Sequence, residues 1–274
     1  NKLYASHFNF DSVNCKLLNI SVTDIDSENF QFTNLIKFNE CQDGAIQAGR
    51  LKPFIKDGQE GLLFTLGQNS RDSLNMKAQD DNSIYGKILF INLAKKEFEI
   101  FAKGFRNPQG LFVENNLIIA TDHGPRGGDE INKVLQNKNY GWPIASYGEP
   151  YGEGNRSRNN EFLLKNYYKK NHSDYGYLEP LYAFIPSIGI SEIIKVSDNF
   201  HPKWSNNFLV SSLGGKSIYR VKFDQKYSRV LFAEKIYIGR RIRDLIYSKE
   251  LDLIFLALED FGQLGILKSG TLQY

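Results

Sequence analysis

The segment "GLFVENNLIIATDHG", residues 110–124, contains the pattern on which the fold depends. An apolar run is followed by a short polar turn, a more strongly apolar run and a polar loop that contains glycine. Short runs rich in branched and aromatic residues, bounded by turn residues, are typical of β-strands. The segment therefore predicts two antiparallel strands, with polar side chains where the second strand ends.

The same order of elements recurs along the chain. It begins again near Leu51, Ile190 and Ile242, and each copy is followed by a further strand-like run. Hardly any window has the apolar spacing of an amphipathic helix. Strand units of about 40 to 50 residues that repeat in this way are typical of propeller blades. We therefore expect an all-β chain in which about five blades are visible.

The ends of the blades determine where a site is expected. Within each blade we expect the strongly apolar strand to lie near the central channel, and the loop that leaves it to face one end of that channel. The loops "GQNS", "TDHG", "SSLGGK" and "LEDFG" then gather round one mouth. Residues 1–22 resemble the middle of a blade without its first strand, which leaves open whether an N-terminal blade is missing.

Composition limits the possible classes of protein. The chain has 274 residues, of which 41% are hydrophobic and 24% are charged, as in ordinary globular proteins. We expect residues 1–274 to form one domain, with an irregular insertion at about residues 124–188. Its 34 basic and 31 acidic residues are scattered, so no nucleic-acid partner is expected. No apolar run approaches the ~20 residues of a membrane span, and none is expected.

The two cysteines do not make a disulfide scaffold. Cys15 and Cys41 each lie in or beside a strand-like run, so adjacent strands are able to bring them together. The sequence leaves two interpretations open, one disulfide or two buried thiols.

Three residues around the third blade are candidates for ligand contact. Arg106 and Asn107 precede a proline, which places them on a rigid extended turn suited to holding a carboxylate or carbonyl group. The alternative is a stiff connection with a solvated arginine. His123 is the one histidine beside a predicted channel loop, although a lone histidine is more often structural than a base.

The loop that follows contains oxygen donors suited to calcium. Gly124 and Pro125 offer backbone carbonyls at a tight bend, Asp129 and Glu130 add carboxylates, and Tyr140 adds another backbone oxygen. Calcium takes carbonyl and carboxylate oxygens without strict geometry. The alternative is a turn in which Asp129 simply caps the loop.

Two arginines lie on one face of the last predicted inner strand. Arg241 and Arg243 are two residues apart, so both side chains leave the strand on the same side. Two guanidinium groups on one face repel each other unless an anion lies between them. That anion is either the carboxylate of a ligand or, within the chain, Asp244 or Glu259.

Taken together, the motifs from about residue 40 onward resemble one enzyme family. They are "RNPQGL", "DHGPRGGDEIN", "KNYGWP", "PSIGI" and "GRRIRD". Their order and spacing are similar to those of the soluble glucose and aldose sugar dehydrogenases that depend on pyrroloquinoline quinone (PQQ), the glucose/sorbosone dehydrogenase family. The resemblance implies a six-bladed β-propeller, a sugar as small-molecule ligand and a periplasmic or secreted location, and it does not define the oligomeric state.

The resemblance also assigns roles to particular positions. It places Arg106, Asn107 and His123 near the quinone and substrate, and it assigns Arg241 and Arg243 to the quinone carboxylates. The carbonyls of Gly124 and Pro125 match those that hold the calcium of the cofactor, while Glu130 and Tyr140 match a second, structural calcium pair. Lys216 is the nearest substitute for a cofactor lysine, because Gly214 stands at the matching position.

Two departures from the family pattern concern the chemistry itself. The position of the catalytic histidine is Ile46, and the position of its aspartate partner is Gln68. Neither side chain can take a proton as a base. We expect a catalytically degenerate propeller that keeps a mouth for calcium and for a sugar or other ligand. The alternative is an active dehydrogenase with a relocated base, His123 or Asp122.

Overall fold

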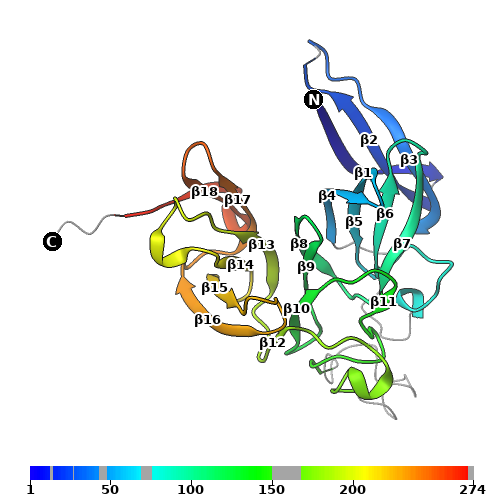
Figure 1. The fold of residues 1–274 in the computed structure, drawn as a ribbon. Coiled ribbons are helices and arrows are strands. Elements are labelled where there is room, and N and C mark those ends of the chain that lie inside the picture. Colours follow the sequence, from blue (N-terminus) through cyan, green and yellow to red (C-terminus); the bar gives the residue numbers. More distant parts are fainter. Residues whose placement is uncertain (13–14, 27, 43–47, 69–75, 150–167, 271–274) are drawn as a thin grey trace.

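The computed structural model describes residues 1–12, 15–26, 28–42, 48–68, 76–149 and 168–270. Ile46 therefore lies outside the described residues. The described residues form five β-sheets that follow one another in an arc around a common centre (Figure 1). These sheets are five blades of a β-propeller, as the repeated pattern predicts.

The first two sheets contain the N-terminal part of the chain. The first has the order β1-β2-β3, formed by Lys2–Ser12, Cys15–Asp24 and Thr33–Gln42. The second has the order β11-β7-β6-β5-β4, where β4 to β7 are Ala48–Lys56, Gln59–Leu66, Lys87–Asn92 and Glu97–Lys103, and β11 is Lys138–Asn139.

The remaining three sheets follow in chain order. The third, β12-β10-β9-β8, contains β8 (Pro108–Glu114), β9 (Leu117–Asp122), β10 (Asp129–Lys133) and β12 (Tyr182–Phe184). The fourth contains β13 (Ile190–Lys195), β14 (Phe208–Ser212), β15 (Ser217–Phe223) and β16 (Val230–Tyr237), and the fifth β17 (Ile242–Ser248), β18 (Leu253–Leu258) and β19 (Gln263–Lys268). Short 3₁₀ turns occupy Met76–Ala78, Ser173–Tyr175, Pro202–Trp204 and Glu259–Phe261.

Residues 124–188, expected as an irregular insertion, contain regular structure. They supply β10 and β12, the two outer strands of the third sheet, and β11, which pairs in parallel with β7 of the second sheet. These strands are only two to five residues long, so their sequence carries no clear alternation.

The innermost strand of each blade is not the strongly apolar one, and that expectation was wrong. Strands β4, β8, β13 and β17 contact one another in succession around the centre. Each is the first strand of the repeated pattern. The strongly apolar strands, such as β5 and β14, lie one position further out, where they are buried between neighbouring sheets.

An ion-pair network joins the four innermost strands at the centre. On β4, the Arg50 Nε donates to the Gln109 carbonyl (2.6 Å) on β8 and lies 3.0 Å from the Glu192 Oε2 on β13. Its Nη1 donates to the Asp244 Oδ2 (2.5 Å) on β17. Glu192 is buried, and this burial raises its pKa while the charge of Arg50 opposes the shift. One guanidinium group therefore connects its own sheet to three others.

Apolar packing joins each sheet to the next. Leu18, Ile20 and Phe38 of the first sheet pack against Leu62 and Phe64 of the second. Close approach at the centre also requires glycine, because a Cβ at Gly110 would lie 2.5 Å from the Ser191 carbonyl.

A disulfide closes the first sheet. Cys15 and Cys41 are bonded, with 5.1 Å between their Cα atoms, so the first of the two interpretations holds. The bond joins β2 to β3, which are neighbours in the sheet. Among the described residues, which are almost entirely strand and loop, no helix is long and apolar enough to cross a membrane.

Candidate functional site

The strand register brings the predicted loops to one end of the propeller. The start of each innermost strand pairs with the end of the next strand, as in Pro108 with Asp122 and Ile242 with Leu258. The loops that follow β5, β9, β14 and β18 therefore lie at the same end, which we call the mouth. A contact between blades agrees with this, since the backbone N–H of Gln68 donates to the Arg106 carbonyl (2.8 Å).

Asp122, the last residue of β9, holds the turn that carries two other candidates. Its Oδ2 accepts a hydrogen bond from the backbone N–H of Arg106 (2.9 Å), and its Oδ1 accepts one from that of Asn107 (2.5 Å). Burial raises the pKa of Asp122 to about 6, although these two hydrogen bonds oppose the shift. The carboxylate therefore positions the turn and has both oxygens engaged.

The Gln109 side chain holds His123 in one tautomer. The Gln109 Oε1 accepts a hydrogen bond from the Arg243 Nη1 (2.6 Å), which fixes the orientation of the amide. The Gln109 Nε2 lies 3.2 Å from the His123 Nδ1, so the amide donates and Nδ1 accepts. The ring then carries its proton on Nε2, and burial lowers the pKa of the imidazole. Gln109 is the glutamine of "RNPQGL", but no local sequence pattern links it to a histidine in another loop.

Arg106 lies against the loop expected to hold calcium. Its Nη1 donates to the carbonyls of His123 (2.7 Å) and Gly124 (2.9 Å), and its guanidinium group lies 5.5 Å from the ring centre of Trp142. Glycine is needed at position 124, because a Cβ there would overlap the Gly128 carbonyl. The Pro125 carbonyl accepts from the Ser187 hydroxyl at 3.2 Å.

These groups do not fit a calcium ion as they are arranged. The Gly124 carbonyl already faces the positive charge of Arg106, which repels a cation. The carboxylate of Asp129 caps the loop, as the alternative interpretation proposed, since it accepts from the backbone N–H groups of Gly124, Ile188 and Ile190. Among the described residues, no group of three or more His, Cys, Asp or Glu side chains is placed to hold a metal. Calcium needs six to eight oxygen ligands.

The second expected calcium pair has a histidine beside it. The Glu130 Oε1 lies 3.6 Å from the His172 Nε2, and both side chains are buried. Burial raises the pKa of Glu130 well above its usual value and lowers that of His172. The Tyr140 hydroxyl donates to the Lys133 carbonyl (2.6 Å), and burial raises its pKa. An imidazole beside a single carboxylate is a poor match for calcium, which prefers oxygen ligands.

The arginine pair holds a carboxylate from its own chain. The Arg241 Nε donates to the Glu259 Oε2 (2.9 Å), and the Arg243 Nη2 donates to the Glu259 Oε1 (2.7 Å). The pKa of Glu259 is lowered, first by the hydrogen bond from Arg243. Of the anions expected between the two arginines, Glu259, a carboxylate of the chain itself, is the one that occupies this place.

Lys216 and Gln68 complete the predicted set. Lys216 is exposed after β14 with a positive φ of 47°, and its backbone carbonyl accepts from the N–H groups of Ile238 and Gly239. The main cause that lowers the pKa of Asp260 is a hydrogen bond from the Arg241 backbone. The positive charge of Lys216 lowers it further. The Gln68 side chain is buried, and its amide has no partner among the described residues.

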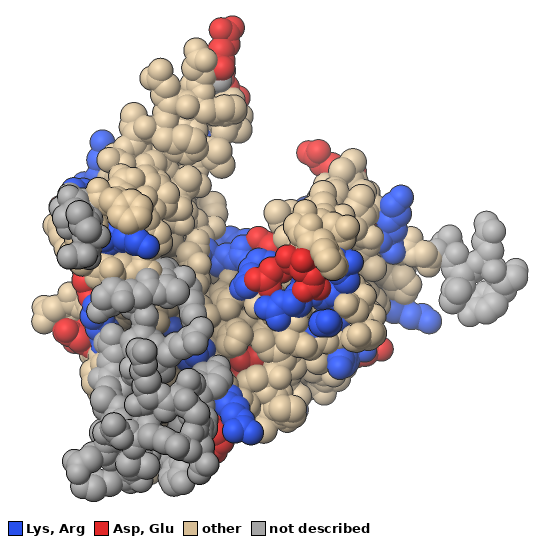
Figure 2. Space-filling view, turned by 180° about the vertical axis from the view of Figure 1, so that it is seen from behind, with Lys and Arg blue, Asp and Glu red and all other residues tan. Residues whose placement is uncertain are grey.

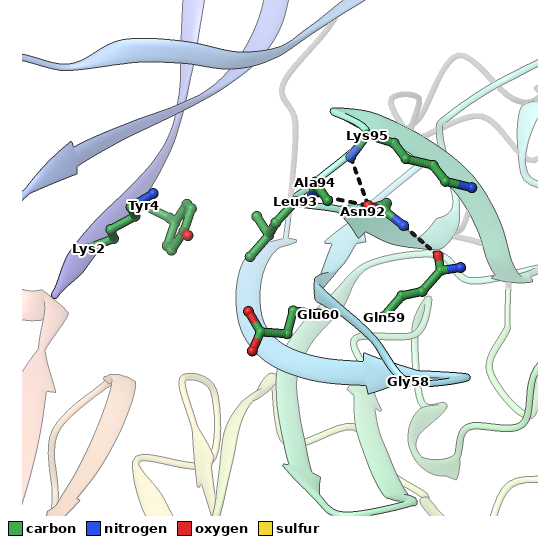
Figure 3. Close-up of a pocket in the computed structure, with 9 residues that line it drawn as sticks. All are labelled: Lys2, Tyr4, Gly58, Gln59, Glu60, Asn92, Leu93, Ala94 and Lys95. Carbon is green, nitrogen blue, oxygen red and sulfur yellow. Dashed lines mark hydrogen bonds between the residues drawn. The ribbon is translucent and has the colours of Figure 1, made fainter.

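A pocket of about 670 Å³ lies away from the mouth (Figure 3). It lies between β1, which carries Lys2 and Tyr4, and the turns that join β4 to β5 and β6 to β7. None of the predicted site residues lines it.

Comparison with known proteins gives a consistent family. The family model described as Glucose / Sorbosone dehydrogenase matches residues 12–266. The chain is 28% identical to Aldose sugar dehydrogenase YliI of Escherichia coli over 79% of this chain and 58% of that protein. The chain spans 58% to 60% of the length of the curated relatives that it matches.

Solved structures share the fold. The apo-form crystal structure of soluble aldose sugar dehydrogenase from Escherichia coli has a TM-score of 0.77 at 24% identity, covering 97% of this chain and 77% of that one. The PQQ-bound form of aldose sugar dehydrogenase from Streptomyces coelicolor has a TM-score of 0.67 at 19% identity, covering 97% and 74%. With the blades, the mouth and the family match all in agreement, the chain belongs to the glucose/sorbosone dehydrogenase family.

Proposed function

We propose that this protein is a sugar dehydrogenase-like propeller that has lost proton abstraction and uses its mouth to bind a sugar or another small ligand. Oxidation of a sugar hydroxyl requires a base that takes the hydroxyl proton, within hydrogen-bond reach of it. The observation that carries the proposal concerns His123. Its Nδ1, the ring nitrogen that could take a proton, already accepts a hydrogen bond from the Gln109 side chain.

The other candidate bases give the same result. Both oxygens of Asp122 accept backbone hydrogen bonds, so abstraction by this carboxylate would release the turn that holds Arg106 and Asn107. Ile46 and Gln68 stand at the positions where the family pattern has its base and its partner. The loss of a general base typically removes about 10²- to 10⁴-fold of the rate.

The cofactor sites support the same conclusion. In a relative, a bound quinone would accept the electrons of the reaction. In this chain, the carboxylates of a quinone would meet Glu259, which already binds Arg241 and Arg243. Calcium would have to move the Arg106 guanidinium group away from the Gly124 carbonyl. We therefore expect weak binding of both, and no dehydrogenase step is assigned to this chain.

We also propose that the protein works outside the cytoplasm. The disulfide between Cys15 and Cys41 supports this location, because such bonds persist mainly in oxidising compartments.

The experiment that tests the proposed function measures turnover and binding separately. Purified protein is supplied with CaCl₂ and PQQ, and aldoses are added with an artificial electron-accepting dye. We expect no dye reduction above a protein-free control, while calorimetry with the same sugars reports on binding. Dye reduction that saturates with sugar would contradict the proposal and favour the active alternative, and His123→Asn and Asp122→Asn variants would then identify the base.

A further inference from the structure

The carboxylate on the arginine pair occupies the place that a ligand carboxylate would take. Arg241 and Arg243 contact different oxygens of Glu259, at 2.9 and 2.7 Å, so one side chain satisfies both guanidinium groups. We propose that Glu259 is a specificity-determining residue that excludes polycarboxylate ligands, including the quinone tricarboxylate, from the mouth. This inference deepens the proposed function and depends on it only because ligands are taken to enter at the mouth.

The backbone fixes Glu259 in this place. It is the first residue of the 3₁₀ turn after β18, and its N–H donates to the Arg241 carbonyl (2.9 Å). The register of the hairpin, with Ile242 opposite Leu258, brings the start of β17 beside the end of β18. The carboxylate is therefore carried to the arginines by the fold of the blade, without movement of any other segment.

Groups of the chain itself already engage the arginines that a ligand would use. Arg243 also donates its Nη1 to Gln109, and the Asp260 carboxylate lies 3.8 Å from the Arg241 Nε and 3.5 Å from the Arg240 Nε. On the face shown in Figure 2, basic and acidic side chains lie interleaved beside the C-terminal part of the chain and do not form a patch of one sign. A ligand with several carboxylates would meet the charge of Glu259 before it reached either arginine.

Solvent reaches this cluster, so the contact is open to competition. The side chains of Arg241, Arg243 and Glu259 are 39%, 42% and 37% exposed. A ligand carboxylate is therefore able to approach once the competing charge is removed. Glutamine is the matched substitution, because it keeps the shape and the acceptor oxygen of glutamate and loses its charge.

The test compares wild type with Glu259→Gln by calorimetric titration at low ionic strength. One ligand is PQQ, and the other is pyridine-2,6-dicarboxylate, a dianion without quinone chemistry. We expect Glu259→Gln to bind both ligands about tenfold more tightly than wild type, because two guanidinium groups become available. We expect the difference to shrink as salt is added, since these charges are partly exposed.

Glu250→Gln is the control, because it removes the same charge from the turn at the opposite end of the β17–β18 hairpin. Its affinity should match that of wild type. Should Glu259→Gln not fold, as judged by circular dichroism, Glu259→Asp shortens the side chain so that it cannot bridge both arginines, and it should also bind more tightly. Equal affinities for wild type and both Glu259 variants, or an equal gain in Glu250→Gln, would overturn the inference. Sugar-dependent dye reduction by wild type would contradict the proposed function. Equal affinities of wild type and the Glu259 variants for pyridine-2,6-dicarboxylate, which cannot support turnover, would overturn this inference alone.

Discussion

Gln109 is a single side chain that connects three parts of the mouth. Its amide oxygen accepts from Arg243, its amide nitrogen donates to His123, and its backbone carbonyl accepts from Arg50. Because the amide has one donor end and one acceptor end, the arginine contact determines the form of the histidine. The histidine ring thereby carries its proton on Nε2.

Replacing Gln109 by glutamate should reverse the effect on His123. A carboxylate 3.2 Å or so from the Nδ1 favours the charged imidazolium, so we expect the pKa of His123 to rise by about one unit or more. NMR titration of the ring protons measures this shift, and the half-buried His201, which lies on the turn before β14, serves as an internal control. An unchanged pKa for His123 in Gln109→Glu would show that the two side chains do not interact.

The buried Asp122 predicts a pH dependence of stability. Its pKa in the folded protein, about 6, lies above the value of 3.8 expected when the chain is unfolded, so the folded state binds the proton more strongly. The resulting penalty is full above pH 6 and is relieved as the pH falls through 6 toward 4, by on the order of 3 kcal/mol. Urea unfolding at pH 5 and pH 8 should show roughly half of this component, about 1.4 kcal/mol, in wild type and none of it in Asp122→Asn. The same pH dependence in both proteins would assign the effect to other groups.

At the residue scale, the sequence shows which side chains need a charged partner better than it shows which residues contact each other. The spacing of Arg241 and Arg243 is enough to predict an anion between them and to name Glu259 as one of two candidates within the chain. The contact of Gln109 with His123 joins a strand to a later loop, and the contact with Arg243 spans 134 residues. Neither has a local signal. The occupation of the Gly124 carbonyl by Arg106 also depends on how a loop folds back, which composition does not determine.

Strand pairs are the elements that the sequence specifies most directly. The pattern at 110–124 predicts β8 and β9, because the short apolar runs at 111–113 and 117–120 on both sides of a polar turn leave few other folds. The order of strands from the centre was predicted incorrectly, since apolar character reports burial between sheets and not distance from the axis. The short strands β10 and β12 were missed because pairing in space, and not their own residues, makes them strands.

The disulfide between β2 and β3 makes a measurable contribution at this scale. It closes a loop with a sequence separation of 26, which corresponds to about 3 kcal/mol of lost entropy in the unfolded chain. We expect reduction to lower the midpoint of thermal unfolding by several degrees. A Cys15→Ser/Cys41→Ser variant should melt at the lower midpoint with or without reductant. Equal midpoints for oxidised and reduced wild type would contradict the prediction.

For the whole molecule, the central network of Arg50, Glu192 and Asp244 joins the second to fifth sheets. Arg50→Met would leave Glu192, whose side chain is 2% exposed, without its counter-ion. Breaking a buried pair in this way typically costs about 3 to 5 kcal/mol. Chemical denaturation measures the loss, and Lys195→Met is the control, because its pair with Glu114 is more exposed and should be worth less than about 1 kcal/mol. Similar losses of unfolding free energy in the two variants would show that the central network contributes no more to stability than an exposed ion pair.

The first sheet stands outside this central network. Arg50 contacts groups on β8, β13 and β17 from its own place on β4, and every described candidate residue of the mouth belongs to the second to fifth sheets or their loops. The first sheet is joined to the others by apolar side chains and by Glu40 of β3, which accepts hydrogen bonds from Ser83 and Ile84 and pairs with Lys77. Its covalent bond lies within the sheet itself. A redox change at that bond therefore alters the rim of the molecule and leaves the charged residues of the mouth in place, so defects in folding and defects in ligand binding are separable by mutation in this protein.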